Sequence, residues 1–199
     1  REFHPKEPFL QIGFPYVDVL KLPKYIFGGC ELSIDTDLKA IEMLFIKQKP
    51  AAVIVELPSN PMLQCIDLPS LSNLAKTYGI PLIADDTIGS ALNIDPMPYV
   101  DLVFSSLTKS FAGKGDILAG SLVINENSKW KNNFLDFIKS NSFSVLSDSD
   151  AIALEIASRD VRKRLPKLNK SCLELKRKLE KHPKIIRVFH PENCENFNK

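Results

Sequence analysis

Two short segments of the chain carry side chains whose types and spacing could do covalent chemistry on a small molecule. Residues 105–109 read Ser-Ser-Leu-Thr-Lys and follow an apolar run, and Asp85 follows another. The hydroxyls of Ser106 and Thr108, two residues apart in a tight turn, could both donate hydrogen bonds to one phosphate group. The adjacent amine of Lys109 could then attack an aldehyde carbon, and burial or nearby positive charge would free it to do so by lowering its pKa. The segment indicates an amine nucleophile beside a phosphate anchor.

Asp85 would be costly to bury directly after a strand unless it had a partner. A protonated ring nitrogen fits, because the ion pair would keep the ring cationic and able to absorb carbanion charge. The local sequence leaves two alternatives open, a helix or turn cap and a metal site shared with Asp86. An aspartic protease motif is excluded, since Thr87 is followed by Ile88 rather than by glycine. We expect no metal site.

The other polar features also have structural explanations. An isolated Ser-x-Thr-Lys is most often a surface lysine in a polar loop, and residues 113–116 (Gly-Lys-Gly-Asp) would let the backbone turn closely beside it. A Walker-type phosphate loop is excluded, because Thr108 stands where the first glycine belongs. Asn60, between Pro58 and Pro61, marks either a plain turn or a rigid residue at the ligand edge.

Short apolar runs alternate with amphipathic helices, and this order decides where the polar groups lie. Such alternation predicts an α/β fold, with three α/β/α layers and a mostly parallel central sheet. Glu56, Asp85 and Ser106 each come directly after an apolar run, so all three are expected at the ligand-binding edge of that sheet. The strands are expected over residues 51–55, 80–84, 102–104 and 117–124, the last one broken by Gly120. One helix is expected from residue 38, with a cap at 35–36, and is closed by Pro50. Two more are expected over 68–78, capped by Asp67 and stopped by Gly79, and over 130–143.

The ends of the chain follow a different pattern. Residues 1–30 are proline-rich and receive no element. A polar connector is expected at 144–150, followed by a helix from Ala151 that has one apolar stripe and a basic face. Pro166 is expected to start or kink a helix rather than lie inside one. Val188 and Phe189 are expected to begin a strand. We therefore expect a major domain over 1–143 and, over 144–199, a connecting helix and the start of a smaller α+β domain.

Bulk properties exclude several classes of protein. The net charge of +2 over 199 residues is too small to indicate nucleic-acid binding, and no apolar run is long enough to span a membrane. The four cysteines lack metal-ligand spacing, which favours reduced thiols in an intracellular, cytoplasmic protein.

In combination and in order, the motifs resemble those of the Cys/Met-metabolism family of pyridoxal phosphate (PLP) enzymes, which have the aspartate-aminotransferase fold. The resemblance runs from about Gly13 to the C-terminus and is strongest to the fungal cystathionine γ-synthase branch. The motifs are Glu-Leu-Pro-Ser-Asn-Pro at 56–61, Asp-Asp-Thr at 85–87, Ser-Leu-Thr-Lys at 106–109, Gly-Lys-Gly-Asp at 113–116 and Ser-Arg-Asp at 158–160.

The resemblance implies roles for four of these side chains. Lys109 is similar to the family's Schiff-base lysine, and Asp85 to the partner of the pyridine nitrogen. Ser106 and Thr108 match the family's phosphate contacts. The implied cofactor is pyridoxal 5'-phosphate.

Two further residues match by position. Asn60 matches the asparagine near the phenolic oxygen of the ring and the substrate carboxylate, and Tyr16 the tyrosine that stacks on the ring. The chain departs from the family pattern at residues 17–18, which are usually glycines, at Asp86, usually asparagine, and at Ser105, usually histidine. The last two changes fit the fungal branch.

The implied activity is γ-replacement on an O-acylhomoserine by cysteine, which gives cystathionine, in a homo-oligomer (a dimer or tetramer). A β- or γ-lyase or a homocysteine-forming sulfhydrylase of the same family is the alternative, and a non-catalytic remnant that keeps the fold is an alternative of another class. The family's N-terminal phosphate loop would lie before Arg1 and its carboxylate-binding arginine after Lys199. We therefore expect a fragment that binds PLP weakly and is inactive alone.

Overall fold

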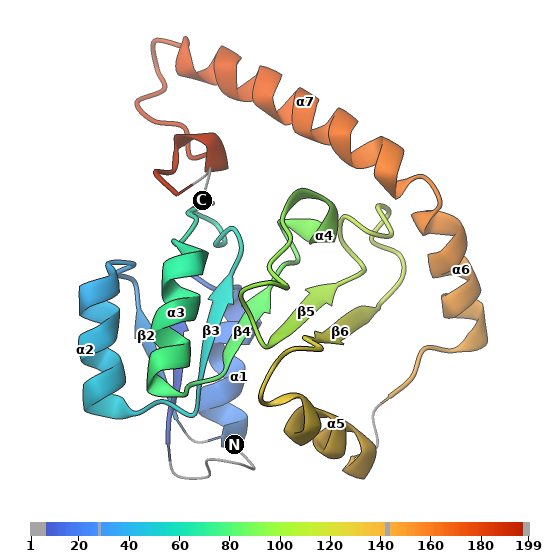
Figure 1. The fold of residues 1–199 in the computed structure, drawn as a ribbon. Coiled ribbons are helices and arrows are strands. Elements are labelled where there is room, and N and C mark those ends of the chain that lie inside the picture. The colour runs from blue at the N-terminus through green and yellow to red at the C-terminus, as the bar shows by residue number, and fades with distance from the viewer. Residues whose placement is uncertain (1–6, 28, 142–143, 197–199) are drawn as a thin grey trace.

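The computed structural model describes residues 7–27, 29–141 and 144–196, and within them the chain forms one six-stranded sheet (Figure 1). The strand order is β2-β1-β3-β4-β5-β6, and only β6 runs antiparallel to its neighbour. The predicted α/β class with a mostly parallel sheet flanked by helices is confirmed. The strands are Phe9–Ile12 (β1), Cys30–Ser33 (β2), Ala52–Glu56 (β3), Leu82–Asp85 (β4), Leu102–Ser106 (β5) and Gly120–Ile124 (β6). The helices are Val17–Phe27 (α1), Leu38–Gln48 (α2), Leu68–Tyr78 (α3), Ser90–Asn93 (α4), Lys131–Ser140 (α5), Asp148–Ser158 (α6) and Val161–Glu180 (α7), followed by the 3-10 turn Pro191–Asn193 (η1).

Helices α2 and α3 begin and end where side chains satisfy their free backbone groups. The carboxylate of Asp67 accepts a hydrogen bond from the Ser70 amide at 3.1 Å, and Gly79 ends α3 in a left-handed conformation, both as predicted. The cap of α2 was expected at 35–36, but Asp37 takes this role and accepts from the Ala40 amide at 3.0 Å. Asp37 lies directly before the first helical residue, which is where a cap acts.

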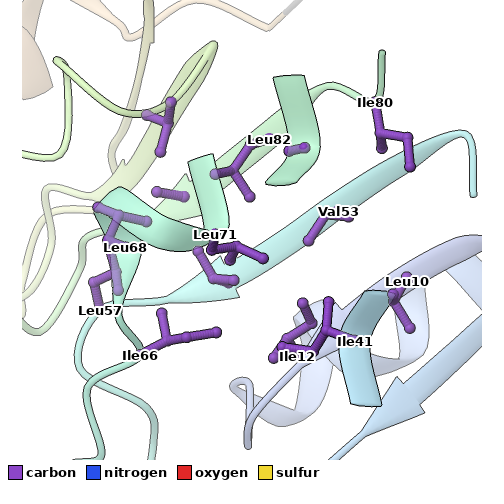
Figure 2. Packing of buried hydrophobic residues seen from close by; sticks show 14 of the residues in the cluster. Leu10, Ile12, Ile41, Val53, Leu57, Ile66, Leu68, Leu71, Ile80 and Leu82 are labelled. Carbon is purple, nitrogen blue, oxygen red and sulfur yellow. The ribbon is translucent and has the colours of Figure 1, made fainter. Parts of the chain in front are cut away.

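The hydrophobic core fills the space between the sheet and helices α2 and α3. Alternate residues of the central strands, such as Val53 and Leu82, point to this face and pack against Leu71 of α3 and Ile41 of α2 (Figure 2). All four side chains are at most 1% exposed. Burial of each such side chain stabilises the fold by about 1.5–3 kcal/mol, so this layer holds the strands in register.

The opposite face of the sheet is covered by α1, which lies behind the sheet in Figure 1. Gln11 of β1, which is fully buried, reaches this helix and donates to the backbone oxygen of Val19 at 2.5 Å. Neither β1, α1 nor β2 was predicted. The two strands contain polar residues and lack a continuous apolar run, and α1 runs through Pro23.

The C-terminal third corrects three expectations. Pro166 lies inside α7, where its missing N–H removes only the bond that the Arg162 carbonyl would receive. Val188 and Phe189 form no strand, since no strand of the described residues pairs with them. Helix α6 already starts at Asp148, because Ser147 accepts from the Asp150 amide at 3.2 Å. Before this region, helix α5 ends at Ser140 and not at the expected residue 143, because the backbone of Asn141 is extended.

Helix α7 carries the chain back across the molecule. It starts beside α6 and runs above the carboxyl ends of the strands, and the segment after it returns to the loop above α3 (Figure 1). None of the helices described here is long and apolar enough to cross a membrane.

Candidate active site

The carboxyl ends of β3, β4 and β5 bring acidic and hydroxyl side chains to one edge of the sheet. Glu56 is in register with Asp85, and Asp85 with Phe104. Ser106 lies two residues beyond Phe104, so Glu56, Asp85 and Ser106 share the sheet face opposite the main core. The structure therefore brings these three residues together at the edge that the sequence indicated.

Thr87 connects two of these strand ends. Its backbone N–H donates to Asp85 Oδ1 at 3.0 Å, and its hydroxyl accepts from the backbone N–H of Ser106 at 2.9 Å. The side chain of Thr87 also forms a hydrogen bond with the Asp85 carboxylate. Thr87 thus fixes the distance between Asp85 and Ser106, which begins the turn that carries Lys109. The motif at 85–87 did not reveal this role.

Glu56 holds the loops after β1 and β3 side by side. It is 5% exposed, and its Oε2 accepts from the backbone N–H of Tyr16 at 2.6 Å. In the same pair of loops the Asn60 amide donates to the Phe14 oxygen at 3.0 Å. These bonds bring Tyr16 and Asn60 to the sheet edge that carries Asp85. Sequence reasoning placed Glu56 at this edge but gave it no role.

The turn after β5 presents Lys109 to solvent. Lys109 is exposed, and within the described residues its amine forms no hydrogen bond or ion pair. The hydroxyl of Thr108 accepts from the Ala119 amide at 3.1 Å and donates to the Ala119 oxygen over a long 3.4 Å. Thr108 therefore ties the turn to the chain before β6, and only its weak donor bond is available for exchange with a ligand.

Arg164 of α7 fastens the same turn from outside. Its guanidinium donates to the oxygens of Ser110 at 2.7 Å and Phe111 at 3.1 Å, while its Nε pairs with Asp160 at 3.1 Å. Gly113 makes this approach possible, because a Cβ there would lie 2.5 Å from Arg164 Nη1. Arg164 is a positioning residue for the turn that carries the predicted nucleophile.

The carboxyl groups at the edge resist ionisation. Burial raises the pKa of Glu56 to about 7, and the nearby charge of Asp85 adds to the shift. Burial also raises the pKa of Asp85, against hydrogen bonds from Thr87 that lower it. In Asp86 burial again raises the pKa, and its Oδ1 is buried with no hydrogen-bond partner. None of the three forms an ion pair with a described residue, so a cationic ring beside Asp85 would supply what the site lacks.

A cavity of about 630 Å³ lies beside this edge. Asp86, Thr87, Ser105 and Ser106 line part of it, together with residues of α4, β6 and the start of α7. Asp85, Lys109, Asn60 and Tyr16 do not line it. The cavity thus borders the acid and hydroxyl cluster rather than containing it.

Tyr16 is less well placed than its sequence match implies. Its ring is 44% exposed, and its hydroxyl bonds to Asp18, whose negative charge raises the pKa of the phenol. Only the backbone of Tyr16 contacts the acidic cluster, through Glu56. Asp18 stands where the family usually has glycine.

A solved structure identifies the class of fold. The chain is similar to a cystathionine γ-lyase from Lactobacillus plantarum, complexed with L-serine, with a TM-score of 0.83 at 21% identity over 94% of this chain and 50% of that one. The fold is that of the major domain of the fold type I PLP-dependent enzymes, as predicted.

The Cys/Met metabolism PLP-dependent enzyme family matches residues 30–198, so the chain belongs to this family. It is 36% identical to a cystathionine γ-synthase of Saccharomyces cerevisiae over 93% of this chain and 30% of the relative. It is 31% identical to a cystathionine γ-synthase of Neurospora crassa over 92% and 30%. It is 30% identical to an L-2-amino-4-chloropent-4-enoate dechlorinase/desaturase of Streptantibioticus cattleyicolor over 92% and 37%. The chain spans about a third of the length of these relatives. The predicted family and its cofactor, PLP, are confirmed.

The residues present fit this cofactor. The site combines the unpaired amine of Lys109, the hydroxyls of Ser106 and Thr108, and a cluster of buried carboxyl groups. None of these carboxyl groups pairs with a cation among the described residues. Asp85 would hold the ring nitrogen, Ser106 and Thr108 the phosphate, and Lys109 the carbonyl carbon. No group of three or more metal-ligating side chains occurs in the described ranges.

Proposed function

We propose that the protein carrying this chain is a cystathionine γ-synthase-like enzyme that joins an O-acylhomoserine to cysteine. The observation that carries the proposal is the arrangement of Glu56, Asp85 and Ser106 on one face of one sheet edge, with Lys109 in the next turn. The names of the two fungal relatives support the choice of reaction. The reaction belongs to the whole protein, of which this chain supplies about a third.

Lys109 would act as the proton carrier. Its exposed amine would bind the cofactor, take the proton from the substrate Cα and then move a proton at Cβ, so that the γ-acyloxy group can leave and the cysteine thiolate can add. When bound, PLP supplies an electron sink for the charge that develops at Cα. A positioned proton carrier of this kind is worth about 10²–10⁴ in rate.

Asp85 and the hydroxyls would orient the cofactor. Asp85 would keep a proton on the ring nitrogen, with Thr87 holding the carboxylate in place. Ser106 would donate to the phosphate, and Thr108 could join it by giving up its 3.4 Å bond to the Ala119 oxygen while still accepting from the Ala119 amide.

Asn60 and Tyr16 complete the proposed site. Asn60 would bind near the phenolic oxygen of the ring and the substrate carboxylate. Tyr16 would have to turn its exposed ring away from Asp18 to stack on the cofactor.

Borohydride trapping tests the cofactor site without measuring turnover. The full-length protein is loaded with PLP, reduced, digested and mapped by mass spectrometry. We expect the cofactor on Lys109, its loss in Lys109→Ala, and its retention in Lys114→Ala, a change in the same loop. Label on another lysine would overturn the role of Lys109, and no label at all would overturn the proposal and favour the non-catalytic remnant.

A lyase is the second candidate, because a relative of similar identity is named for a different reaction, a dechlorination/desaturation. The two are separated by supplying O-acylhomoserine with and without cysteine. Cystathionine that forms only with cysteine supports the synthase. Release of 2-oxobutyrate or pyruvate without cystathionine supports the lyase.

The remaining expectations concern the whole protein. We propose a boundary near residue 143 between the major domain and the second domain, a homo-oligomer and a cytoplasmic location. The polar connector before α6 supports the boundary, the family to which the chain belongs supports the oligomer, and the four free thiols support the location.

A further inference from the structure

Two cysteines that are far apart in the sequence touch each other. The sulfur of Cys194 accepts from the Cys65 amide at 3.2 Å and donates to the Cys65 carbonyl oxygen at 3.3 Å. Both residues are half-buried and free. Cys65 lies in the loop after β3, and Cys194 follows η1, so the contact joins the sheet edge to the end of the described chain.

The geometry is within the reach of a disulfide. Because the amide nitrogen and the Cα are about 1.5 Å apart, the sulfur of Cys194 lies less than about 5 Å from the Cα of Cys65. Asn196 donates to the same Cys65 oxygen at 3.0 Å and holds this part of the chain in place. Disulfides join cysteines whose Cα atoms are about 4.4–6.8 Å apart, and the contact of the Cys194 sulfur with the backbone of Cys65 brings the two residues near this range.

The other two cysteines have no such neighbour. Cys30 donates to the oxygen of Glu31, next to it in β2, and Cys172 lies on the exposed side of α7. Neither forms a hydrogen bond to another cysteine in the described part of the chain. The contact between Cys65 and Cys194 is therefore specific among the four.

We propose that Cys65 and Cys194 form a reversible disulfide, with a small-molecule disulfide such as oxidised glutathione as the oxidant. The first protein thiolate attacks glutathione disulfide and releases one glutathione thiolate. The second then attacks the mixed disulfide and releases another. The two cysteines lose two electrons and two protons, and the two glutathione molecules gain them.

Burial disfavours the reactive form of Cys65. It raises the pKa of this thiol to about 11, so its thiolate is scarce at neutral pH.

The bond would fasten the C-terminal segment to a loop of the candidate site. Cys65 directly follows the turn in which the Ser59 amide donates to the Gln64 oxygen at 2.9 Å and the Gln64 amide to Ser59 Oγ at 3.1 Å. That turn contains Asn60. Oxidation would thus link residues 181–196 covalently to this loop and restrict their opening.

Thiol mapping in glutathione buffers of increasing oxidised fraction tests the proposal. The protein is quenched by alkylation, digested without reduction and analysed by mass spectrometry. We expect a peptide that cross-links residues 65 and 194, reversed by dithiothreitol, and a rate of trypsin cleavage within residues 181–196 that is lower by about tenfold in the oxidised protein.

The matched variants are Cys30→Ser, which also removes a half-buried thiol, and Cys172→Ser. Both should keep the cross-link and the protection, and Cys65→Ser and Cys194→Ser should lose both. Glutathione adducts on Cys65 and Cys194 without a cross-linked peptide in the wild type, or cross-links scrambled with Cys30 or Cys172, would show the proposal to be wrong. The result does not depend on PLP or on turnover.

Discussion

At the scale of single residues, the chemistry of this chain depends on carboxyl groups that are buried before any ligand binds. Glu56 and Asp85 lie side by side on one face of the sheet, and burial raises the pKa of both. Such a cluster destabilises the chain whenever the groups are ionised, and it favours a positively charged ligand. The stability of the protein and its affinity for PLP should both depend on these two residues.

Glu56 should make the stability of the protein depend on pH. Its pKa rises from an ordinary value of 4.5 to about 7 in the folded state, so the native state binds its proton more tightly than the unfolded state. The stabilisation is complete below the unfolded pKa and is lost as the pH rises through about 7. In wild type the free energy of unfolding should therefore fall between about pH 5 and pH 8 by roughly 2–3 kcal/mol more than in Glu56→Gln. Urea unfolding at both pH values measures the difference. Exposed Glu174→Gln is the control, and parallel curves for wild type and Glu56→Gln would contradict the assignment.

Asp85 and Asp86 are neighbours that should respond differently to the same substitution. Asp85→Asn should weaken PLP binding in the full-length protein by about 10²-fold, because a neutral amide cannot hold a proton on the ring nitrogen. Asp86→Asn removes a charge whose Oδ1 has no hydrogen-bond partner, so it should raise the melting temperature and change PLP affinity little. Titration of the visible absorbance with PLP and thermal unfolding measure both effects. Equal losses of affinity in the two variants would argue against a special role for Asp85.

The sequence revealed only some of these residues. Asp85 and Ser106 could be predicted, because each comes directly after a buried strand and the ends of parallel strands meet at one edge. Thr87 and Arg164 could not be predicted in the same way. Arg164 binds backbone oxygens 53 and 54 residues away, and no pattern of side chains records such a contact.

At the scale of elements, the turn after β5 is held by contacts from α7. The fixed guanidinium of Arg164 lies where a side chain on Gly113 would have to go, whereas Gly115, two residues later, has nothing within 4 Å of its Cβ position. Both glycines have a positive φ, near +80° and +76°. The two positions therefore differ in the room available for a Cβ atom and not in backbone strain.

Gly113→Ala should cost more stability than Gly115→Ala. Each alanine loses about 1–2 kcal/mol to the left-handed backbone, but at position 113 it must also displace the guanidinium from its carbonyl partners, for roughly 2 kcal/mol more. The excess should disappear in an Arg164→Ala background. A double-mutant cycle from denaturant unfolding measures this coupling, and equal costs at the two glycines would show that Arg164 moves away freely.

The elements that the sequence predicted and those it missed differ in their local signals. Helix α3 has a carboxylate cap, apolar residues at helical spacing and a terminal glycine, and its bounds were predicted. Strands β1 (Phe-Leu-Gln-Ile) and β2 (Cys-Glu-Leu-Ser) include polar residues and lack a continuous apolar run, so no local pattern distinguishes them from loops. Their place in the sheet comes from pairing with β3 and with each other, a long-range effect.

At the scale of the whole molecule, α7 brings the end of the described chain back to the sheet edge. Lys176 connects α7 to η1: its amine pairs with Glu192 of η1 at 2.8 Å and with Glu180 of α7 at 3.3 Å. The side chain of Lys176 is 9% exposed, in a helix whose other basic residues are mostly exposed. The ion pairs of this mostly buried amine therefore hold the segment between α7 and η1 in place.

Lys176→Gln should release the segment from α7 without unfolding the sheet. A neutral amide can replace one hydrogen bond but not two ion pairs, so residues 181–196 should open more often, and trypsin should cleave after Lys184 or Arg187 several-fold faster. The melting of the sheet core should change little, because these contacts lie outside it. Lys178→Gln, two residues away and exposed, removes the same charge from the same helix and should leave the cleavage rate unchanged. High salt should speed cleavage of the wild type and have less effect on Lys176→Gln. Limited proteolysis read by mass spectrometry measures all these rates, and identical rates in the two variants would show that the ion pairs do not hold the segment.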